Sequence, residues 1–233
     1  MSFITENVKI AKDRIAAAAL AAGREPCSVR LLAATKMNGA EAVGEAVRAG
    51  VDLCGENRVQ EFCDKLAVNA YAPCPVHFIG HLQRNKVKYL VGRAELIHSV
   101  DSEALMAEID RRAAALGVVQ DVLIEVNIGG EASKSGVAEG DICRLLEAAG
   151  HCGALRVRGL MTIPPAAEKI GGNERYFARM NELFVDIRQK KYDNVLMDEL
   201  SMGMSDDYEQ AIRYGATIVR LGTALFGPRN YTT

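Results

Sequence analysis

The 233-residue sequence predicts an α/β protein folded as one closed (β/α)8 barrel of the TIM type with an extra N-terminal helix. Two observations lead to this prediction. Short apolar, β-branched runs recur eight times along the chain, and segments with helical spacing of apolar residues lie between them. The runs are too apolar to leave one face in water, which is typical of parallel strands covered by helices.

The expected strands share a short run of mostly apolar residues. They span residues 29–34, 51–54, 76–79, 96–100, 122–126, 155–160, 195–200 and 216–220. The expected helices share apolar residues three or four positions apart. They span residues 40–49, 58–66, 83–91, 104–116, 142–149, 176–187 and 206–214. Each strand followed by a helix is one βα unit.

An open doubly wound sheet is the alternative to the barrel. Such a sheet usually carries a glycine-rich G-x-G-x-x-G turn after its first strand, whereas residues 34–39 here read ATKMNG. No linker or change of composition divides the chain, so residues 1–233 are expected to form a single domain. Residues 3–22, rich in alanine, predict the extra helix before the first strand, which could close the bottom of the barrel or pack on its side.

Composition limits the class of protein. With 49% hydrophobic and 25% charged residues and a net charge of −2, the chain indicates neither a nucleic-acid nor a membrane partner. No secretory signal and no run of about 18 apolar residues is visible, so we expect a cytoplasmic protein. The six cysteines form no C-x-x-C pair, which predicts reduced, mostly buried thiols and no metal site.

Two small polar turns near the end of the chain predict a phosphate site. Residues 200–207 (LSMGMSDD) and 219–227 (VRLGTALFG) each follow a strand and precede a helix. Backbone N–H groups and the hydroxyls of Ser201 and Thr223 could therefore converge on one dianion. A single turn of this kind is usually only a turn, but two at the ends of successive strands indicate a shared ligand.

Lys36 closes the first apolar strand. It could extend to water along the barrel rim, or it could point into the barrel mouth as a reactive amine. A lysine amine, an arginine (Arg220) and a phosphate-binding turn together are the groups that pyridoxal phosphate requires.

Six segments at strand ends resemble one known family. They are residues 32–36 (LAATK), 55–61 (GENRVQE), 77–86 (HFIGHLQRNK), 125–136 (EVNIGGEASKSG), 158–164 (RGLMTIP) and 200–206 (LSMGMSD). The chain resembles, from first strand to last, the pyridoxal phosphate homeostasis family, also called the YggS or proline-synthase co-transcribed family. That family is similar to the N-terminal barrel domain of alanine racemase and is regarded as a cofactor carrier or regulator.

The resemblance implies a set of cofactor contacts in which Lys36 forms the internal aldimine and Arg220 faces the pyridine nitrogen. The other implied contacts are Ser201, Gly222 and Thr223 for the phosphate, the backbone of Met202 and Gly203 beside it, and Asn57, Ile79, His81 and Met161 around the ring. The sequence departs from the family pattern at Thr35 and Gly129, where serine is common.

Several alternatives stay open at this stage. Glu56 and Asn57 could cap the following helix instead of contacting a cofactor, and His81 could be a surface residue. Residues 133–136 could form a lid or a solvated loop.

Two functions are compatible with these residues: a carrier that stores and delivers pyridoxal phosphate, and an amino-acid racemase using the same lysine. Racemases of this type add a second domain with a catalytic tyrosine, and the sequence ends at Thr233 after the eighth unit. We therefore expect a carrier without catalytic residues. Its expected partners are pyridoxal phosphate and the apoenzymes that receive it, and we expect a monomer or a weak homodimer.

Overall fold

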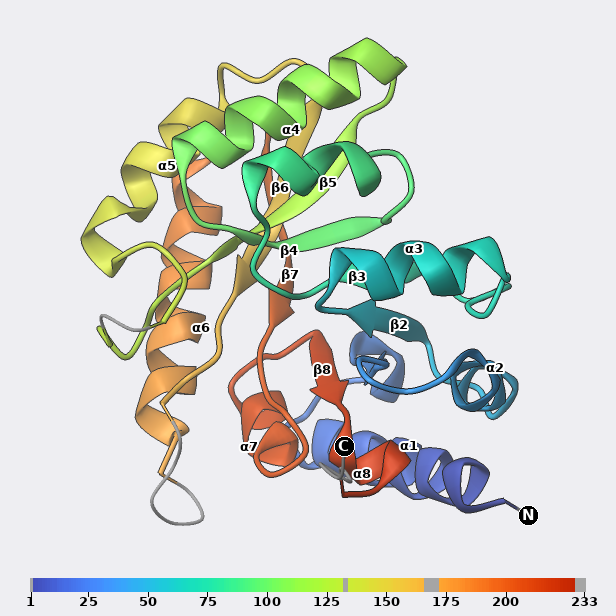
Figure 1. Cartoon of the computed structure of the whole chain (residues 1–233). Helices are drawn as coiled ribbons and strands as arrows, with labels where there is room; N and C mark the ends of the chain where they lie inside the picture. Colours follow the sequence, from blue (N-terminus) through green and yellow to red (C-terminus); the bar gives the residue numbers. More distant parts are fainter. Residues whose placement is uncertain (1, 132–133, 166–171, 229–233) are drawn as a thin grey trace.

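The computed structural model describes residues 2–131, 134–165 and 172–228 and contains a closed barrel of eight parallel strands in sequence order (Figure 1). The strands are β1 (Arg30–Ala34), β2 (Leu53–Glu56), β3 (Val76–Phe78), β4 (Leu96–Val100), β5 (Gln120–Glu125), β6 (Leu155–Met161), β7 (Val195–Ser201) and β8 (Ile218–Leu221). The prediction of a TIM-type barrel is confirmed. β1 pairs with both β2 and β8, which closes the sheet.

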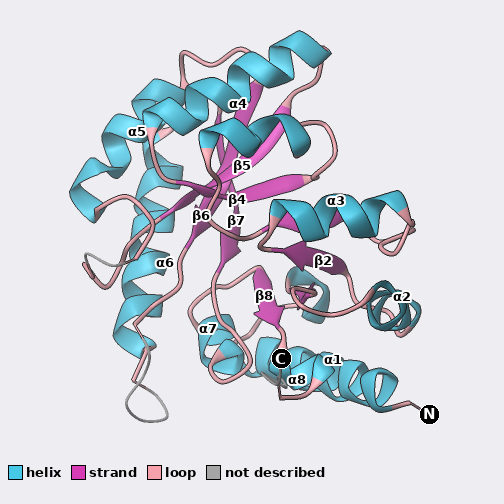
Figure 2. Ribbon diagram, viewed as in Figure 1, coloured by secondary structure: helices cyan, strands magenta, loops and turns pink. Residues whose placement is uncertain are grey.

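The helices lie outside the strands (Figure 2). They are α1 (Phe3–Ala21), α2 (Ala40–Arg48), α3 (Val59–Ala67), α4 (Glu103–Leu116), α5 (Ile142–Ala149), α6 (Glu174–Lys190), α7 (Tyr208–Arg213) and α8 (Thr223–Phe226), with 3-10 helices η1 (Pro26–Ser28), η2 (Arg84–Tyr89) and η3 (Glu139–Asp141). The ends of α4 show how sequence sets such boundaries. The Ser102 hydroxyl accepts a hydrogen bond from the Leu105 amide, and Gly117 ends the helix at φ 66°.

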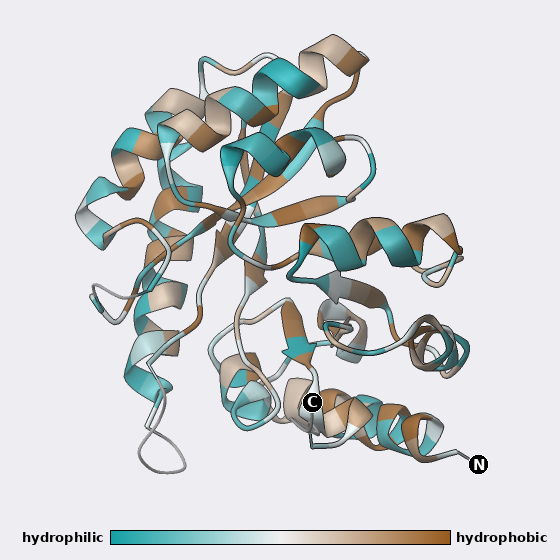
Figure 3. Cartoon of the chain, in the orientation of Figure 1, coloured by the Kyte–Doolittle hydropathy of each residue, from teal (hydrophilic) through white to brown (hydrophobic). Residues whose placement is uncertain are grey.

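Alternating residues on each strand divide the apolar side chains into two groups. One group packs between the strands and the surrounding helices; Figure 3 shows most strands as hydrophobic and the helices as alternating hydrophobic and hydrophilic residues. The other group fills the barrel interior: Leu32, Leu53, Leu96, Leu123, Met161 and Ile218, with Ile79 against them. Polar side chains from β3, β4, β7 and β8 share that interior.

The extra N-terminal helix is present, as predicted, and it packs on the side of the barrel. α1 contacts α7, α8 and α2, which are all outer helices. The alternative in which this helix closes the barrel bottom does not fit these contacts.

Two expectations about local structure are wrong. The segment expected as a helix at residues 83–91 is instead the 3-10 helix η2, which buries Val87 and is followed by the buried C-cap residue Leu90. The thiols are all unpaired, as expected, but only Cys54 is buried, whereas Cys27 and Cys143 are exposed.

Candidate functional site

A cavity of about 440 Å³ opens at the carboxyl-terminal ends of the strands. Its lining residues come mostly from strand ends and the loops after them: Ala34, Lys36, Asn57, Ile79, Gly80, His81, Glu125, Lys134, Ser135, Ile163, Met204, Ser205, Asp206, Arg220, Gly222 and Thr223. This is the end of the barrel at which sites form in this fold. The predicted residues that line the cavity are Lys36, Asn57, Ile79, His81, Arg220, Gly222 and Thr223. The predicted residues outside its lining are Met161, Ser201, Met202 and Gly203.

The backbone on both sides of Lys36 is tied to α3. Lys65 donates a hydrogen bond to the Thr35 carbonyl (2.8 Å), and the Met37 amide donates to a Glu61 carboxylate oxygen (2.7 Å). Lys36, half-buried between these two fixed residues, lines the cavity. Of the two readings of Lys36, the structure therefore matches the one in which it lines the barrel mouth.

A buried ion pair lies directly beneath this loop. Lys65 pairs with Glu56, whose side chain is fully buried, and lies 3.2 Å from a carboxylate oxygen of Glu61. The Thr35 hydroxyl donates to the same Glu56 carboxylate at 2.6 Å. Because ion pairs out of water hold their geometry firmly, this network fixes the position of the β1–α2 loop.

Asn57 follows β2 and lines the cavity. The capping alternative is wrong for Asn57 and Glu56, because α3 begins at Val59 and its N-cap residue is Arg58, with no side-chain capping bond. The Asn57 Oδ1 atom is buried and has no hydrogen-bond partner within the described chain. Gly80 packs so closely against the backbone of Asn57 that an added Cβ would lie 2.2 Å from the Asn57 carbonyl oxygen.

Arg220 is almost fully buried, yet it contributes to the cavity wall. Its guanidinium donates to the Ser201 hydroxyl (2.6 Å) and to the Thr162 carbonyl (2.8 Å). Burial lowers its pKa to about 10, and the negative charge of Glu125 opposes that shift. The group is therefore a fixed cation at neutral pH.

Glu125, at the end of β5, is a cavity residue that was not predicted as a contact. Burial raises its pKa to about 7; the negative charge of Asp101 adds to the shift and Arg220 opposes it. Its Oε2 atom has no hydrogen-bond partner among the described residues. The sequence pattern that pointed to Lys36 could also have pointed to Glu125, because both are ionisable residues at the end of an apolar strand.

The sequence predicted that Ser201 contributes its hydroxyl to the phosphate turn. In the structure, Ser205 and not Ser201 lines the cavity. The Ser201 hydroxyl lies inside the barrel, where it contacts Arg220 and a ring nitrogen of His98 (3.1 Å). Ser205, four residues further on, lines the cavity instead, and its hydroxyl accepts from the amides of Gly222 (3.3 Å) and Ala224 (3.2 Å). These amides form the start of α8, so the predicted N–H-rich turn is present with a different hydroxyl.

The other predicted contacts that do not line the cavity are buried behind its wall. Met161 packs in the apolar barrel interior, and Ile163, two residues later, lines the cavity. Met202 is fully buried. Gly203 adopts φ 91°, and a Cβ there would lie 2.6 Å from that of Ala211, so this glycine lets the turn pass close to α7.

His81 is exposed and stands at the cavity rim. Its Nδ1 atom lies 3.7 Å from a carboxylate oxygen of Asp101 and 3.4 Å from the Ser135 hydroxyl. Lys134 and Ser135 line the cavity, so this part of the loop expected as a lid or solvated segment borders the site. Ser133 lies outside the described residues.

Comparison with known proteins identifies the family. The alanine racemase N-terminal domain family matches residues 5–230. A pyridoxal phosphate homeostasis protein of Aquifex aeolicus is 46% identical over 226 residues, which is 97% of this chain and 98% of that protein. The chain belongs to the pyridoxal phosphate homeostasis protein family. The member from Pseudomonas aeruginosa is 44% identical over 231 residues, 99% of this chain and 98% of that protein.

Solved structures agree with the assignment. PipY of Synechococcus elongatus PCC7942, solved with pyridoxal phosphate bound, has a TM-score of 0.80 and 35% identity, covering 93% of this chain and 99% of PipY. Alanine racemase of Streptomyces lavendulae has a TM-score of 0.75 at 16% identity, over 97% of this chain and 57% of the enzyme. The second likeness shows the fold alone.

None of the described helices is long and apolar enough to cross a membrane. Within the described residues, no group of three or more His, Cys, Asp or Glu side chains is arranged to hold a metal ion.

Proposed function

We propose that this chain binds pyridoxal phosphate in the cavity at the strand ends and acts as a cytoplasmic carrier in the homeostasis of that cofactor. The observation that supports this most directly is the common cavity of Lys36, Arg220 and the amide-rich turn at Gly222. A relative of 35% identity, PipY, holds pyridoxal phosphate in its structure.

The polar atoms of the cavity fit such a ligand. Asn57 Oδ1 and Glu125 Oε2 are buried beside the cavity without hydrogen-bond partners among the described residues, and buried polar atoms normally find one. When bound, pyridoxal phosphate supplies an aldehyde that condenses with a lysine amine, a dianionic phosphate, a ring nitrogen that accepts a hydrogen bond, and a ring hydroxyl that can donate one to such an oxygen.

Each residue then has a distinct role. Lys36 would hold the aldehyde covalently through its amine, and the bond from Lys65 to the Thr35 carbonyl fixes the backbone beside it. Arg220 would meet the ring nitrogen, where its permanent charge would disfavour a proton. We assign the phosphate to Thr223, Ser205 and the turn at Gly222, with Ser205 replacing Ser201 because Ser205 lines the cavity.

A carrier role is supported over catalysis by the same arginine. An unprotonated ring withdraws electrons weakly, so proton removal from a bound amino acid is discouraged. The relatives of 34–46% identity are named homeostasis proteins. The second candidate is an amino-acid racemase using Lys36, and Glu125 would then be the additional acid or base.

Binding is tested by absorbance and by borohydride reduction followed by peptide mapping. Wild type should give a visible absorbance band and a reduced adduct on Lys36, and Lys36→Ala should lose both. Lys9→Ala, at an exposed position on α1, is the control and should keep both. An adduct that maps to Lys134 or Lys65 with Lys36 intact would contradict the site assignment.

Catalysis is tested by incubating the loaded protein with L-amino acids in deuterated water. A carrier should transfer its cofactor to an apoenzyme without exchanging the α-proton. Racemisation or exchange at about 1 s⁻¹ or faster, an ordinary enzyme rate, would establish the racemase instead. Sedimentation in the same buffer tests the expected monomer or weak homodimer.

A further inference from the structure

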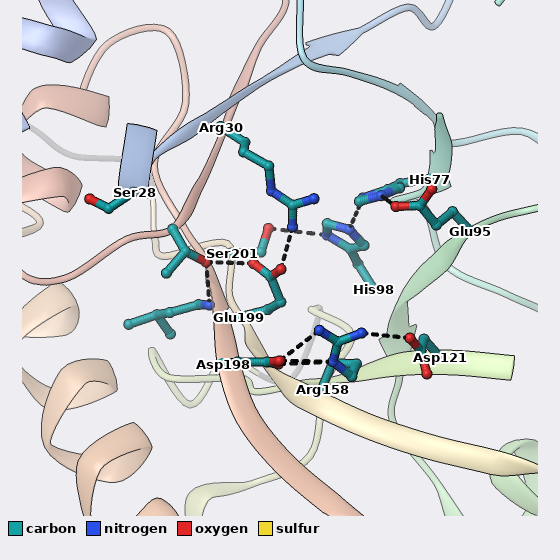
Figure 4. Close-up of polar contacts among 12 residues, drawn as sticks. Ser28, Arg30, His77, Glu95, His98, Asp121, Arg158, Asp198, Glu199 and Ser201 are labelled. Carbon is teal, nitrogen blue, oxygen red and sulfur yellow. Dashed lines mark hydrogen bonds and ion pairs between the residues drawn. The ribbon is translucent and has the colours of Figure 1, made fainter. Parts of the chain in front are cut away.

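A row of polar side chains crosses the barrel interior beneath the cavity. Glu95 precedes β4 at the amino-terminal end of the barrel, and its Oε1 lies 3.5 Å from His77 Nε2. His77 Nδ1 lies 2.9 Å from His98 Nε2, and His98 Nδ1 lies 3.1 Å from the Ser201 hydroxyl. Ser201 then accepts from Arg220. Figure 4 shows the two imidazoles between Glu95 and Ser201.

This row links the two ends of the barrel. The Glu95 side chain is 55% exposed, whereas that of His77 is 1% exposed and His98 is fully buried. Arg220, at the other end, lines the cavity. A surface carboxylate is thus connected to a cavity cation through three buried side chains.

Only one arrangement of protons satisfies every contact. Arg220 can only donate, so the Ser201 oxygen accepts and the Ser201 proton is left to donate to His98 Nδ1. His98 then carries its proton on Nε2 and donates to His77 Nδ1. His77 in turn carries its proton on Nε2 and donates to the Glu95 carboxylate.

The reverse arrangement fails at both ends. If His98 donated from Nδ1 to Ser201, the serine proton would have no acceptor among these four partners. His77 would then donate from Nδ1, and its bare Nε2 lone pair would face the Glu95 carboxylate. Two acceptors in contact repel, and a buried donor without a partner costs free energy.

Burial keeps both imidazoles neutral. Burial, the largest effect, lowers the pKa of His77, with Glu95 and Glu199 opposing and Arg30 adding to the shift. Burial also lowers the pKa of His98 well below its usual value, and His77, Arg220 and Arg30 add to it. The hydrogen bond from His77 lowers the pKa of Glu95 and favours its anion. A cation stands at the donor end of the row and an anion at the acceptor end.

We infer that Ser201, His98, His77 and Glu95 form one directed hydrogen-bond chain whose task is to position the Arg220 guanidinium at the cavity. Ser201 and His98 are therefore positioning residues, and Glu95 anchors the chain at the opposite end of the barrel. The consequence for pyridoxal phosphate rests on the proposed function: the chain sets how Arg220 meets the ring nitrogen.

The chain itself is tested without ligand by nitrogen NMR of the imidazoles in the apo-protein. Signals of His77 and His98 should show protons on Nε2 only, with no imidazolium, and Ser201→Ala should shift the His98 Nδ1 signal. The exposed His81 and His151 provide reference signals in the same spectrum. A proton on Nδ1 of either buried histidine, or an unchanged His98 signal in Ser201→Ala, overturns the inference.

The effect on the ligand is tested by comparing pyridoxal phosphate with an analogue that has carbon in place of the ring nitrogen. Ser201→Ala and the surface variant Glu95→Ala, which removes the acceptor of the His77 bond, should weaken pyridoxal phosphate binding by roughly two- to tenfold, the worth of one neutral hydrogen bond. Neither should weaken binding of the analogue, which cannot accept from Arg220. Glu25→Ala, at an exposed carboxylate before β1 outside the chain, is the control.

The outcomes separate the two proposals. If wild type binds neither compound, the proposed function fails, while the NMR result still decides on the hydrogen-bond chain. If wild type prefers pyridoxal phosphate and both variants retain the full preference, the positioning role of the chain is wrong. Ser201→Ala could also disturb packing, but Glu95→Ala changes a side chain that is 55% exposed and avoids that problem.

Discussion

Replacing Lys65 by methionine should destabilise the protein more than any change at its surface ion pairs. The Lys65 side chain is 9% exposed and its partner Glu56 is fully buried. Methionine fills a similar space but removes the cation and the bond to the Thr35 carbonyl. The Glu56 carboxylate then stays buried without its counter-charge.

The expected loss follows from that buried charge. Removing one partner of a buried pair costs about 3–5 kcal/mol, because the other charge is left uncompensated. For a domain of this size each kcal/mol lowers Tm by about 2–4 °C, so Lys65→Met should melt about 6–20 °C below wild type. The double variant Glu56→Gln with Lys65→Met should melt higher than Lys65→Met, since no charge remains buried.

Thermal unfolding followed by circular dichroism measures these differences. Lys12→Met is the control, because Lys12 forms a comparable pair with Asp52 (2.9 Å) that is largely exposed and should be worth no more than about 1 kcal/mol. A loss in Lys65→Met no larger than in Lys12→Met would refute the reasoning.

Three further predictions concern the cavity. Ser205→Ala should weaken pyridoxal phosphate by about 10- to 150-fold, the worth of a hydrogen bond to a charged group, and leave pyridoxal almost unchanged; equilibrium dialysis with both ligands checks this, and equal losses would argue against the phosphate contact. Because burial raises the pKa of Glu125 to about 7, its ionisation destabilises the fold above that pH and not below its ordinary value of 4.5. Glu125→Gln should therefore stabilise the apo-protein by up to about 3 kcal/mol at about pH 8 and not at about pH 4, measured by denaturant titration; an equal effect at both would contradict the assignment. Gly80→Ala should cost about 1–3 kcal/mol, since its Cβ would meet the Asn57 backbone, whereas Gly140→Ala, with no atom within 4 Å, should change stability by less than about 0.5 kcal/mol in the same titration.

The fold was predictable because its signals repeat. Eight apolar strands and the helical segments between them give the barrel order, and the strand ends give the face on which the cavity forms. The 3-10 helix η2 was not predictable from spacing alone, since Val87, Leu90 and Val91 also fit one face of an α-helix. Tertiary packing decided between the two.

The sequence indicated which strands contribute residues to the site. It did not indicate which side chain at the end of a strand reaches the cavity and which stays inside the barrel. Strand register places Glu125 beside Met161 and Met161 beside Ser201. Of these three, only Glu125 lines the cavity. Met161 packs with the interior leucines, and the short Ser201 side chain bonds Arg220.

At β7, a residue beyond the strand reaches the cavity, whereas the last residue within the strand does not. Ser201 ends β7, and its side chain points into the barrel, level with Ile218 on β8. Arg220 lies two residues further along β8, so its longer side chain extends from the interior to the cavity wall. Ser205 arrives at the cavity only because the chain turns at Gly203. A serine in the sequence therefore indicates a hydroxyl near the strand end, and the turn decides whether that hydroxyl reaches the cavity, as in Ser205, or bonds the buried Arg220, as in Ser201.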